Sequence, residues 1–163
     1  MKDDIKIIKK AIKGNKRAFF KLIKKYKNYL YKIAYLQTKY DDDAKAIFEE
    51  TIYNGFNNIH KLNTNLSFKI WITRILMNEI DYFLESTGMV DRGYEINYNS
   101  YDLYSAIDIL EPKVKSVIIL RYYCNFNINE ISEILELSPS TVNTFTRRGL
   151  KEMKGILSED SVC

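Results

Sequence analysis

Residues 127–157, NINEISEILELSPSTVNTFTRRGLKEMKGIL, decide the fold class of this chain. Asn127 suits the N-cap of a helix, and Glu130 stands three residues on, as in a capping box. Ser138 suits the cap of a second helix, with Pro139 at its first position, where no hydrogen bond is lost. Two short helices joined by a tight turn predict a helix-turn-helix. The apolar residues of the first helix recur at helical spacing: Ile128, Ile131, Ile134 and Leu135.

The second helix of this pair has two chemically different faces at about 100° per residue. The inner face is predicted to hold Val142, Thr146, Gly149 and Met153, with Phe145 and Leu150 at its margins. The outer face is polar and cationic: Ser140, Asn143, Thr144, Arg147, Arg148, Lys151 and Lys154. Ser, Thr, Asn and Arg read base edges, and Lys and Arg neutralise phosphates. The stretch therefore indicates DNA binding, although a solvated amphipathic helix would look similar.

The composition excludes several classes of protein. His60, Cys124 and Cys163 are too few for a disulfide framework or a zinc site. No Gly-rich phosphate loop, HExxH or GxSxG occurs, so we expect no enzyme, no metal and no cofactor. No apolar run approaches the roughly 18 residues of a membrane span. The amphipathic N-terminus lacks a signal-peptide core, which predicts a cytoplasmic protein.

Charge is distributed unevenly along the chain. Residues 1–32 carry twelve Lys or Arg, and their only acids are Asp3 and Asp4. Residues 41–50, DDDAKAIFEE, are strongly acidic. The basic segment favours a polyanion or simply a solvated face, and the acidic block favours a helix N-terminus or a basic protein partner.

Helical periodicity covers most of the chain and predicts an all-α fold. Asp41 to Asp43 are expected to cap the third helix, and Ser67 the fourth, which ends near Leu84. The expected helices span 3–13, 16–38, 43–59, 67–84, 102–110 and 112–124, followed by the helix-turn-helix. We predict two small helical domains, 1–86 and 102–163, joined by a flexible linker over 87–101.

Three segments resemble the extracytoplasmic-function (ECF) group of bacterial RNA polymerase sigma factors, within the sigma-70 family. Residues 42–56, DDAKAIFEETIYNGF, are similar to that group's core-binding helix, DAEDLVQETFLRAW. Residues 65–84, NLSFKIWITRILMNEIDYFL, are similar to its SSFRTWLYRIARNLALDYL segment. Residues 110–153 follow its LPxxxRxVxxLRYxxGxSxxEIAxxLGxSxxTVKSRLxRAxxxL pattern. The three segments occur in the family's order and together cover nearly the whole chain.

The resemblance implies a sigma factor that directs promoter-specific transcription initiation. Its partners would be core RNA polymerase, promoter DNA and an anti-sigma protein, without a small-molecule substrate or direct membrane insertion. The polymerase would bind Ile47, Glu49, Glu50 and Thr51. The −10 element would meet the loop 61–67 and the next helix through Asn63, Asn65, Ser67, Phe68, Lys69, Trp71 and Arg74. The −35 element would meet Ser140, Thr141, Asn143, Thr144, Arg147 and Arg148.

Several positions depart from the family pattern. Glu136 stands where the turn usually has Gly, and a left-handed conformation there would cost Glu about 1 kcal/mol. Phe145 replaces a basic residue and Thr146 a core Leu, so either the helix is rotated or Phe145 reaches thymine methyls. Asn143 replaces Lys, and the fourth helix ends in LEST rather than a basic cluster. Trp71 has two interpretations, a core anchor, which the sequence slightly favours, or a platform for bases.

Two other functions fit parts of the sequence. One is a dimeric helix-turn-helix transcriptional regulator that acts without polymerase. The other is a sigma mimic that sequesters an anti-sigma protein. A plain regulator would not need the acidic helix and aromatic segment within residues 42–84, and a mimic would not need the polar face of the last helix.

Overall fold

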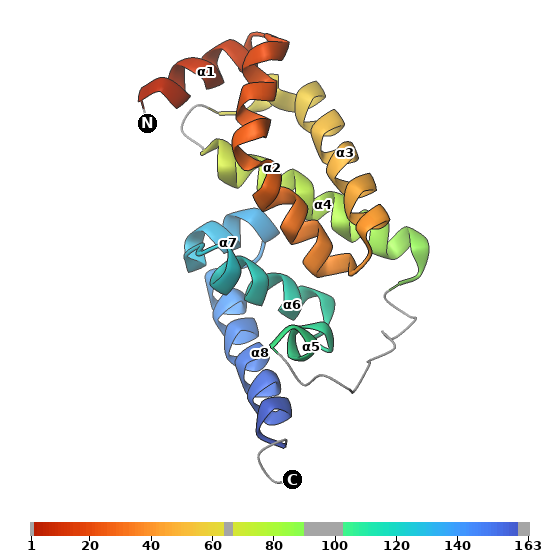
Figure 1. The fold of residues 1–163 in the computed structure, drawn as a ribbon. Helices are drawn as coiled ribbons and strands as arrows, with labels where there is room; N and C mark the ends of the chain where they lie inside the picture. Colours follow the sequence, from red (N-terminus) through yellow and green to blue (C-terminus); the bar gives the residue numbers. More distant parts are fainter. Residues whose placement is uncertain (1, 64–66, 90–102, 160–163) are drawn as a thin grey trace. The chain divides into compact units, whose positions relative to one another are not determined.

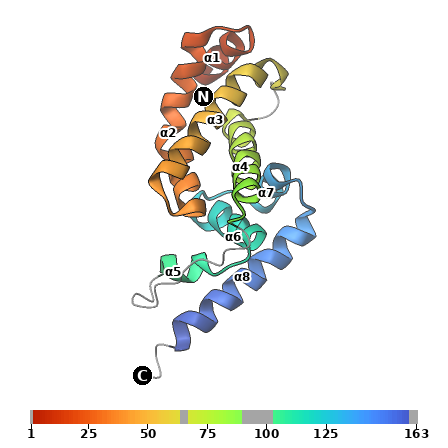
Figure 2. The same cartoon turned by 90° about the vertical axis from the view of Figure 1, so that its right-hand side faces the viewer.

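The computed structural model describes residues 2–63, 67–89 and 103–159. Figures 1 and 2 show the fold, in which every regular element of the described residues is a helix. The chain divides into two compact units, residues 1–83 (unit 1) and 84–163 (unit 2). Most of the linker predicted over 87–101 lies outside the described residues, so the domain limits given above remain a prediction. No helix of the described residues is long and apolar enough to cross a membrane.

Unit 1 is built from helices whose limits lie close to the predicted ones. They are α1 (Lys2–Ile12), α2 (Lys16–Thr38), α3 (Asp41–Asn58), the short 3-10 helix η1 (Ile59–Lys61) and most of α4 (Phe68–Thr87), whose residues 84–87 fall within the limits of unit 2. Asn15 caps α2, because its Oδ1 accepts the Ala18 amide at 2.9 Å. Helix α4 continues through the LEST segment to Thr87, beyond the predicted end near Leu84, and Gly88 follows with φ +65°.

Helices α2 and α3 lie side by side and antiparallel in unit 1 (Figure 1). The Phe19 ring of α2 meets Phe56 of α3 edge-on, with centroids 5.4 Å apart, and Phe68 of α4 at 6.4 Å. Gly55 permits this approach, since a Cβ there would lie 2.9 Å from Ile72 Cδ1 and 3.3 Å from Phe19 Cζ. A small residue on α3 therefore lets three helices share one aromatic core.

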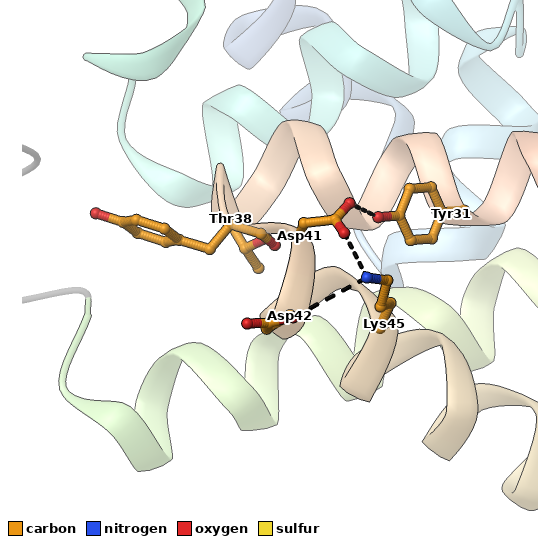
Figure 3. Close-up of polar contacts among 6 residues, drawn as sticks. Tyr31, Thr38, Asp41, Asp42 and Lys45 are labelled. Atoms are coloured by element: carbon orange, nitrogen blue, oxygen red, sulfur yellow. Dashed lines mark hydrogen bonds and ion pairs between the residues drawn. The ribbon is translucent and has the colours of Figure 1, made fainter.

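The corner between α2 and α3 is held by side chains rather than by a helix cap (Figure 3). Tyr40 occupies the N-cap position and makes no side-chain cap hydrogen bond, so the predicted capping by Asp41 to Asp43 is wrong. These residues instead lie in the first turn, where negative charge is favourable. Asp41 accepts a hydrogen bond from the Tyr31 hydroxyl and pairs with Lys45 at 2.5 Å. Lys45 and Tyr31 together lower the pKa of Asp41.

Unit 2 contains α5 (Leu103–Asp108), α6 (Pro112–Ile118), the π-helical turn η2 (Ile119–Tyr123), α7 (Ile128–Leu135) and α8 (Pro139–Glu159). The predicted helix 112–124 is thus an α-helix that widens into a π turn, where the Cys124 amide donates to the Ile119 carbonyl at 3.1 Å. Cys124 is buried, and Asn125 turns the chain with φ +57°. One core cluster joins α5, α6 and α8: Ala106, Leu110, Val114, Ile118 and Met153.

A buried ion pair also links α5 to α6. Lys115 Nζ lies 3.2 Å from Asp108 Oδ1, and the two side chains are 2% and 14% exposed. A charge this deeply buried requires a partner, because desolvation of an unpaired ammonium is expensive. The pair therefore fixes the end of α5 against α6.

Candidate nucleic-acid interface

The helix-turn-helix begins with the predicted capping box. The Asn127 side chain accepts the Glu130 amide at 3.0 Å, and the Glu130 carboxylate accepts the Asn127 amide at 2.8 Å. Both orphan donors at the start of α7 are therefore satisfied by side chains. The capping box predicted from the sequence is confirmed.

The turn after α7 keeps the left-handed conformation that glycine favours. Glu136 has φ +54° and ψ 39°, and its amide donates to the Ser132 carbonyl. The Leu137 amide donates to the same carbonyl at 3.1 Å, and the Ser132 hydroxyl donates to the Leu137 carbonyl. The chain thus forms the usual turn with a residue that is strained in it.

Helix α8 begins at a cluster of hydroxyl groups. The Ser138 Oγ accepts the Thr141 amide at 3.1 Å, which confirms Ser138 as the cap. It also lies 2.9 Å from the Ser140 hydroxyl and 2.7 Å from the Thr141 hydroxyl. The Thr144 hydroxyl donates to the Ser140 carbonyl at 3.0 Å. Short polar side chains therefore crowd the N-terminal end of α8. Helix α7 packs against α8 in unit 2 (Figure 1).

The inner face of α8 follows the predicted register with one exception. Val142, Gly149 and Met153 are buried, but Leu150 is 43% exposed and does not belong to this face. Phe145 is partly buried and packs against the core cluster of unit 2. It therefore packs towards the protein interior. Thr146 is also partly buried, and its hydroxyl donates to the Val142 carbonyl at 2.8 Å.

The outer face of α8 carries the predicted polar residues. Asn143 and Thr141 are partly exposed. The exposed members are Ser140, Thr144, Arg147, Arg148, Lys151 and Lys154. Arg147 makes no ion pair in the described part of the chain, whereas Arg148 makes two. These pairs, with Glu152 and Glu111, raise the pKa of Arg148.

The predicted polymerase-binding residues divide between the surface and the interior of unit 1. Glu49 and Glu50 are exposed on α3, and neither forms an ion pair with another described residue. Tyr53, one turn further along the helix, is 65% exposed. Ile47 and Thr51 are buried, and the Thr51 hydroxyl donates to the Ile47 carbonyl at 2.8 Å. These two residues therefore hold α3 in place rather than face a partner.

The residues predicted to meet the −10 element are divided in the same way. Asn63 and Ser67 are exposed, whereas Asn65 lies outside the described residues. Phe68 is 2% exposed and belongs to the core, with its ring 5.7 Å from Tyr26 and 5.8 Å from Trp71. Trp71, which lies beside Phe68, is partly buried. Lys69 and Arg74 are also partly buried. Lys69 Nζ lies 4.8 Å from the Tyr29 ring centroid, a cation–π contact.

The sequence interpretation missed the two carboxylates that hold Arg148. Glu152 follows Arg148 by four residues, a helical spacing that the sequence alone displays. Glu111 precedes α6 and is far from Arg148 in the sequence, so only the packing of α6 on α8 brings them together.

The fold defines a two-unit helical protein whose second unit contains a helix-turn-helix with an exposed polar face. Residues 100–153 match the family model described as sigma-70, region 4. The chain is 28% identical to RNA polymerase sigma factor SigV of Bacillus subtilis (strain 168) over 148 residues, covering 84% of this chain and 89% of SigV. It is 25% identical to ECF RNA polymerase sigma factor SigW of the same organism, covering 91% of this chain and 94% of SigW.

Two solved structures have the same fold. CnrH, in complex with the cytosolic domain of CnrY, aligns with a TM-score of 0.78 and 19% identity, covering 96% of this chain and 98% of CnrH. The sigma factor RpoE, in complex with the anti-sigma factor NepR from Bartonella quintana, aligns with a TM-score of 0.73 and 18% identity, covering 86% and 96%. Over most of its length the chain is thus similar to sigma factors, among them one of the extracytoplasmic-function group, and residues 100–153 match sigma-70 region 4.

Proposed function

We propose that this sigma factor selects promoters by reading two DNA elements while it is bound to core RNA polymerase. The observation that carries the proposal is the exposed polar face of α8, within the residues that match sigma-70 region 4. A face that offers hydroxyl, amide and guanidinium donors suits base edges and phosphates of the major groove. Unit 2 would place this face in the −35 element through Ser140, Thr141, Asn143, Thr144, Arg147 and Arg148.

Unit 1 would provide the contact with the polymerase. Exposed carboxylates that lack an internal cation partner are suited to a basic surface on another protein. Glu49 and Glu50 on α3 meet this description, and we assign the docking surface to them. Ile47 and Thr51 would support that surface from the interior.

The −10 element would meet the loop 61–67 and the start of α4. Asn63, Asn65 and Ser67 would supply hydrogen bonds to an unstacked base, and Lys69 and Arg74 would neutralise the backbone. The buried Phe68 would support Trp71 rather than touch DNA. A base pulled from the stack costs a few kcal/mol, which these contacts would offset.

The contacts with the −10 and −35 elements would reinforce each other only when the chain is bound to the polymerase. Once both units are mounted on one enzyme, the second DNA contact becomes effectively intramolecular. The isolated chain would therefore bind duplex DNA weakly and with strong salt dependence. The chain itself would act in the cytoplasm and catalyse no reaction, since the polymerase carries out the chemistry.

An anti-sigma protein would hold the chain inactive. The structurally similar RpoE was solved with the anti-sigma factor NepR, and CnrH was solved with the cytosolic domain of CnrY. Their fold is shared by this chain, which makes a similar partner reasonable to test.

Reconstitution tests the proposal directly. Purified chain should be retained by immobilised core polymerase and should direct run-off transcription from a cognate promoter that core enzyme alone ignores. A chain that fails to bind core polymerase, yet occupies a palindromic operator as a dimer, would overturn the proposal. Capture of an anti-sigma protein without any transcription would do so as well.

A further inference from the structure

Two adjacent arginines of α8 have different environments. Arg147 is exposed and forms no ion pair with the described residues. Arg148 is held by two carboxylates, with its Nε 2.7 Å from Glu152 Oε1 and its Nη1 2.7 Å from Glu111 Oε2. Side chains one residue apart diverge by about 100° around a helix, so the two guanidinium groups serve different sides of α8. Their chemistry toward DNA should differ accordingly.

The two carboxylates fix the plane of the Arg148 guanidinium. Glu152 approaches from the next turn of α8, and Glu111 approaches from the N-cap of α6. A guanidinium carries five N–H donors in a rigid fork. With Nε and one Nη1 hydrogen engaged, the outer edge of the fork still offers donors to a ligand, and the side chain remains 47% exposed. Arg148 is thus oriented before any DNA arrives.

The same carboxylates change the charge that DNA would meet. One cation stands beside two anions, so the Arg148 flank carries no excess positive charge. A phosphate gains little from such a site, because the carboxylates repel it. A guanine edge is neutral and presents two acceptors, O6 and N7, to a bidentate arginine. Arg147, Lys151 and Lys154 are exposed and form no ion pair with described residues, which suits them to phosphates.

We propose that Arg148 reads a guanine edge in the major groove, positioned and charge-balanced by Glu111 and Glu152, whereas Arg147 neutralises a phosphate. The proposal rests on the proposed function in one respect, that α8 enters the upstream element. Glu111 and Glu152 are positioning residues and do not touch DNA themselves. Ion pairs as exposed as these stabilise a fold only weakly, so removing them should alter recognition more than folding.

The test combines sequence selection with salt dependence. Core polymerase carrying the full chain selects from promoter duplexes with a randomised upstream segment, and the bound DNA is sequenced. Affinity for the selected duplex is then measured from low to high salt. The slope of log affinity against log salt concentration is called the salt slope. The variants are Arg148→Gln, Glu111→Gln and, as the matched control, Arg147→Gln. Thermal unfolding of each variant reports whether it folds.

The proposal predicts opposite signatures for the two arginines. Arg148→Gln should abolish a guanine preference worth roughly tenfold or more at one position and leave the salt slope unchanged. Arg147→Gln should keep every preference, weaken binding to all duplexes and reduce the salt slope by about 0.9. Glu111→Gln should weaken the same guanine preference and steepen the salt slope, because the freed cation can then reach a phosphate.

Other results would overturn the proposal that Arg148 reads a guanine. If Arg148→Gln reduces the salt slope and keeps the sequence preference, Arg148 contacts a phosphate instead of a base. A wild-type guanine preference in Glu111→Gln would remove the positioning role. If Arg148→Gln does not fold, Glu111→Gln decides alone, since it keeps the arginine. Failure of the wild-type chain to select any sequence would reject the proposed function instead, so the two failures are distinguishable.

Discussion

Ile118 of α6 occupies the space that a side chain at Gly149 of α8 would need. A Cβ built on Gly149 would lie 2.6 Å from Ile118 Cγ1, 2.8 Å from its Cδ1 and 3.0 Å from Val114 Cγ1. Distances this short are not tolerated between carbon atoms, so α6 and α8 approach as closely as they do because residue 149 lacks a side chain. Helix α8 therefore packs on the core of unit 2 through a glycine.

Gly149→Ala should accordingly destabilise unit 2 although it improves helix propensity. The propensity gain is at most about 1 kcal/mol, and overpacking a core typically costs about 1–3 kcal/mol. Gly155→Ala is the matched control, because nothing lies within 4 Å of its Cβ position. It should stabilise the chain by up to about 1 kcal/mol. Urea unfolding measures both, and equal stabilisation by the two variants would contradict the close contact.

Glu136→Gly should stabilise the helix-turn-helix. Glu136 has φ +54°, a conformation that costs a non-glycine residue about 1 kcal/mol. Glu133→Gly provides the control, since Glu133 is exposed within α7 and glycine there should cost about 1 kcal/mol. Thermal unfolding should show shifts of opposite sign. A lower melting temperature for Glu136→Gly would mean that the Glu136 side chain contributes more than its strain costs.

Acid should weaken the corner between α2 and α3. Because Lys45 and Tyr31 lower the pKa of Asp41 in the folded state, its stabilising contribution is fully present above the ordinary carboxyl pKa of about 4. That contribution is lost as pH falls through the lower folded pKa. Asp41→Asn should therefore reduce stability near neutral pH and have little effect at strongly acidic pH, as followed by urea unfolding at several pH values.

Asp42→Asn is the control for this effect, because Asp42 is exposed and lies 4.0 Å from Lys45. Asp42→Asn loses only the favourable charge in the first turn of α3, which Asp41→Asn loses as well, so its destabilisation near neutral pH should be the smaller of the two. Salt should diminish the Asp41 effect, since the pair is exposed. An Asp41→Asn effect of equal size at acidic and neutral pH would show that the carboxylate charge is not responsible.

Charge reversal on α3 should separate polymerase binding from DNA reading. Glu49→Lys combined with Glu50→Lys should weaken retention on core polymerase at least tenfold, because like charges across an interface cost a few kcal/mol. Glu133→Lys reverses an exposed acid in unit 2 and should leave retention unchanged. Arg147→Ala should instead reduce promoter-dependent transcription while retention persists. Wild-type retention by the double variant would move the docking surface away from Glu49 and Glu50.

Features that depend on neighbours within one or two helical turns could be predicted from the amino-acid sequence. The Asn127–Glu130 capping box, the Ser138 cap and the helix starting at Pro139 all lie where their spacing predicted them. Periodicity likewise located most helix limits in unit 1 to within a few residues. These features are local because a helix brings residues three and four apart together whatever surrounds it.

The contacts between residues of different helices, in contrast, became known from the three-dimensional arrangement of the helices. It placed Phe145 against the core, left Leu150 exposed and brought Glu111 to Arg148. It also made Asp41 the partner of Tyr31 on α2 instead of a cap. A helical pattern gives each side chain a direction but not the crossing of its neighbours, and that crossing depends on packing the whole core at once.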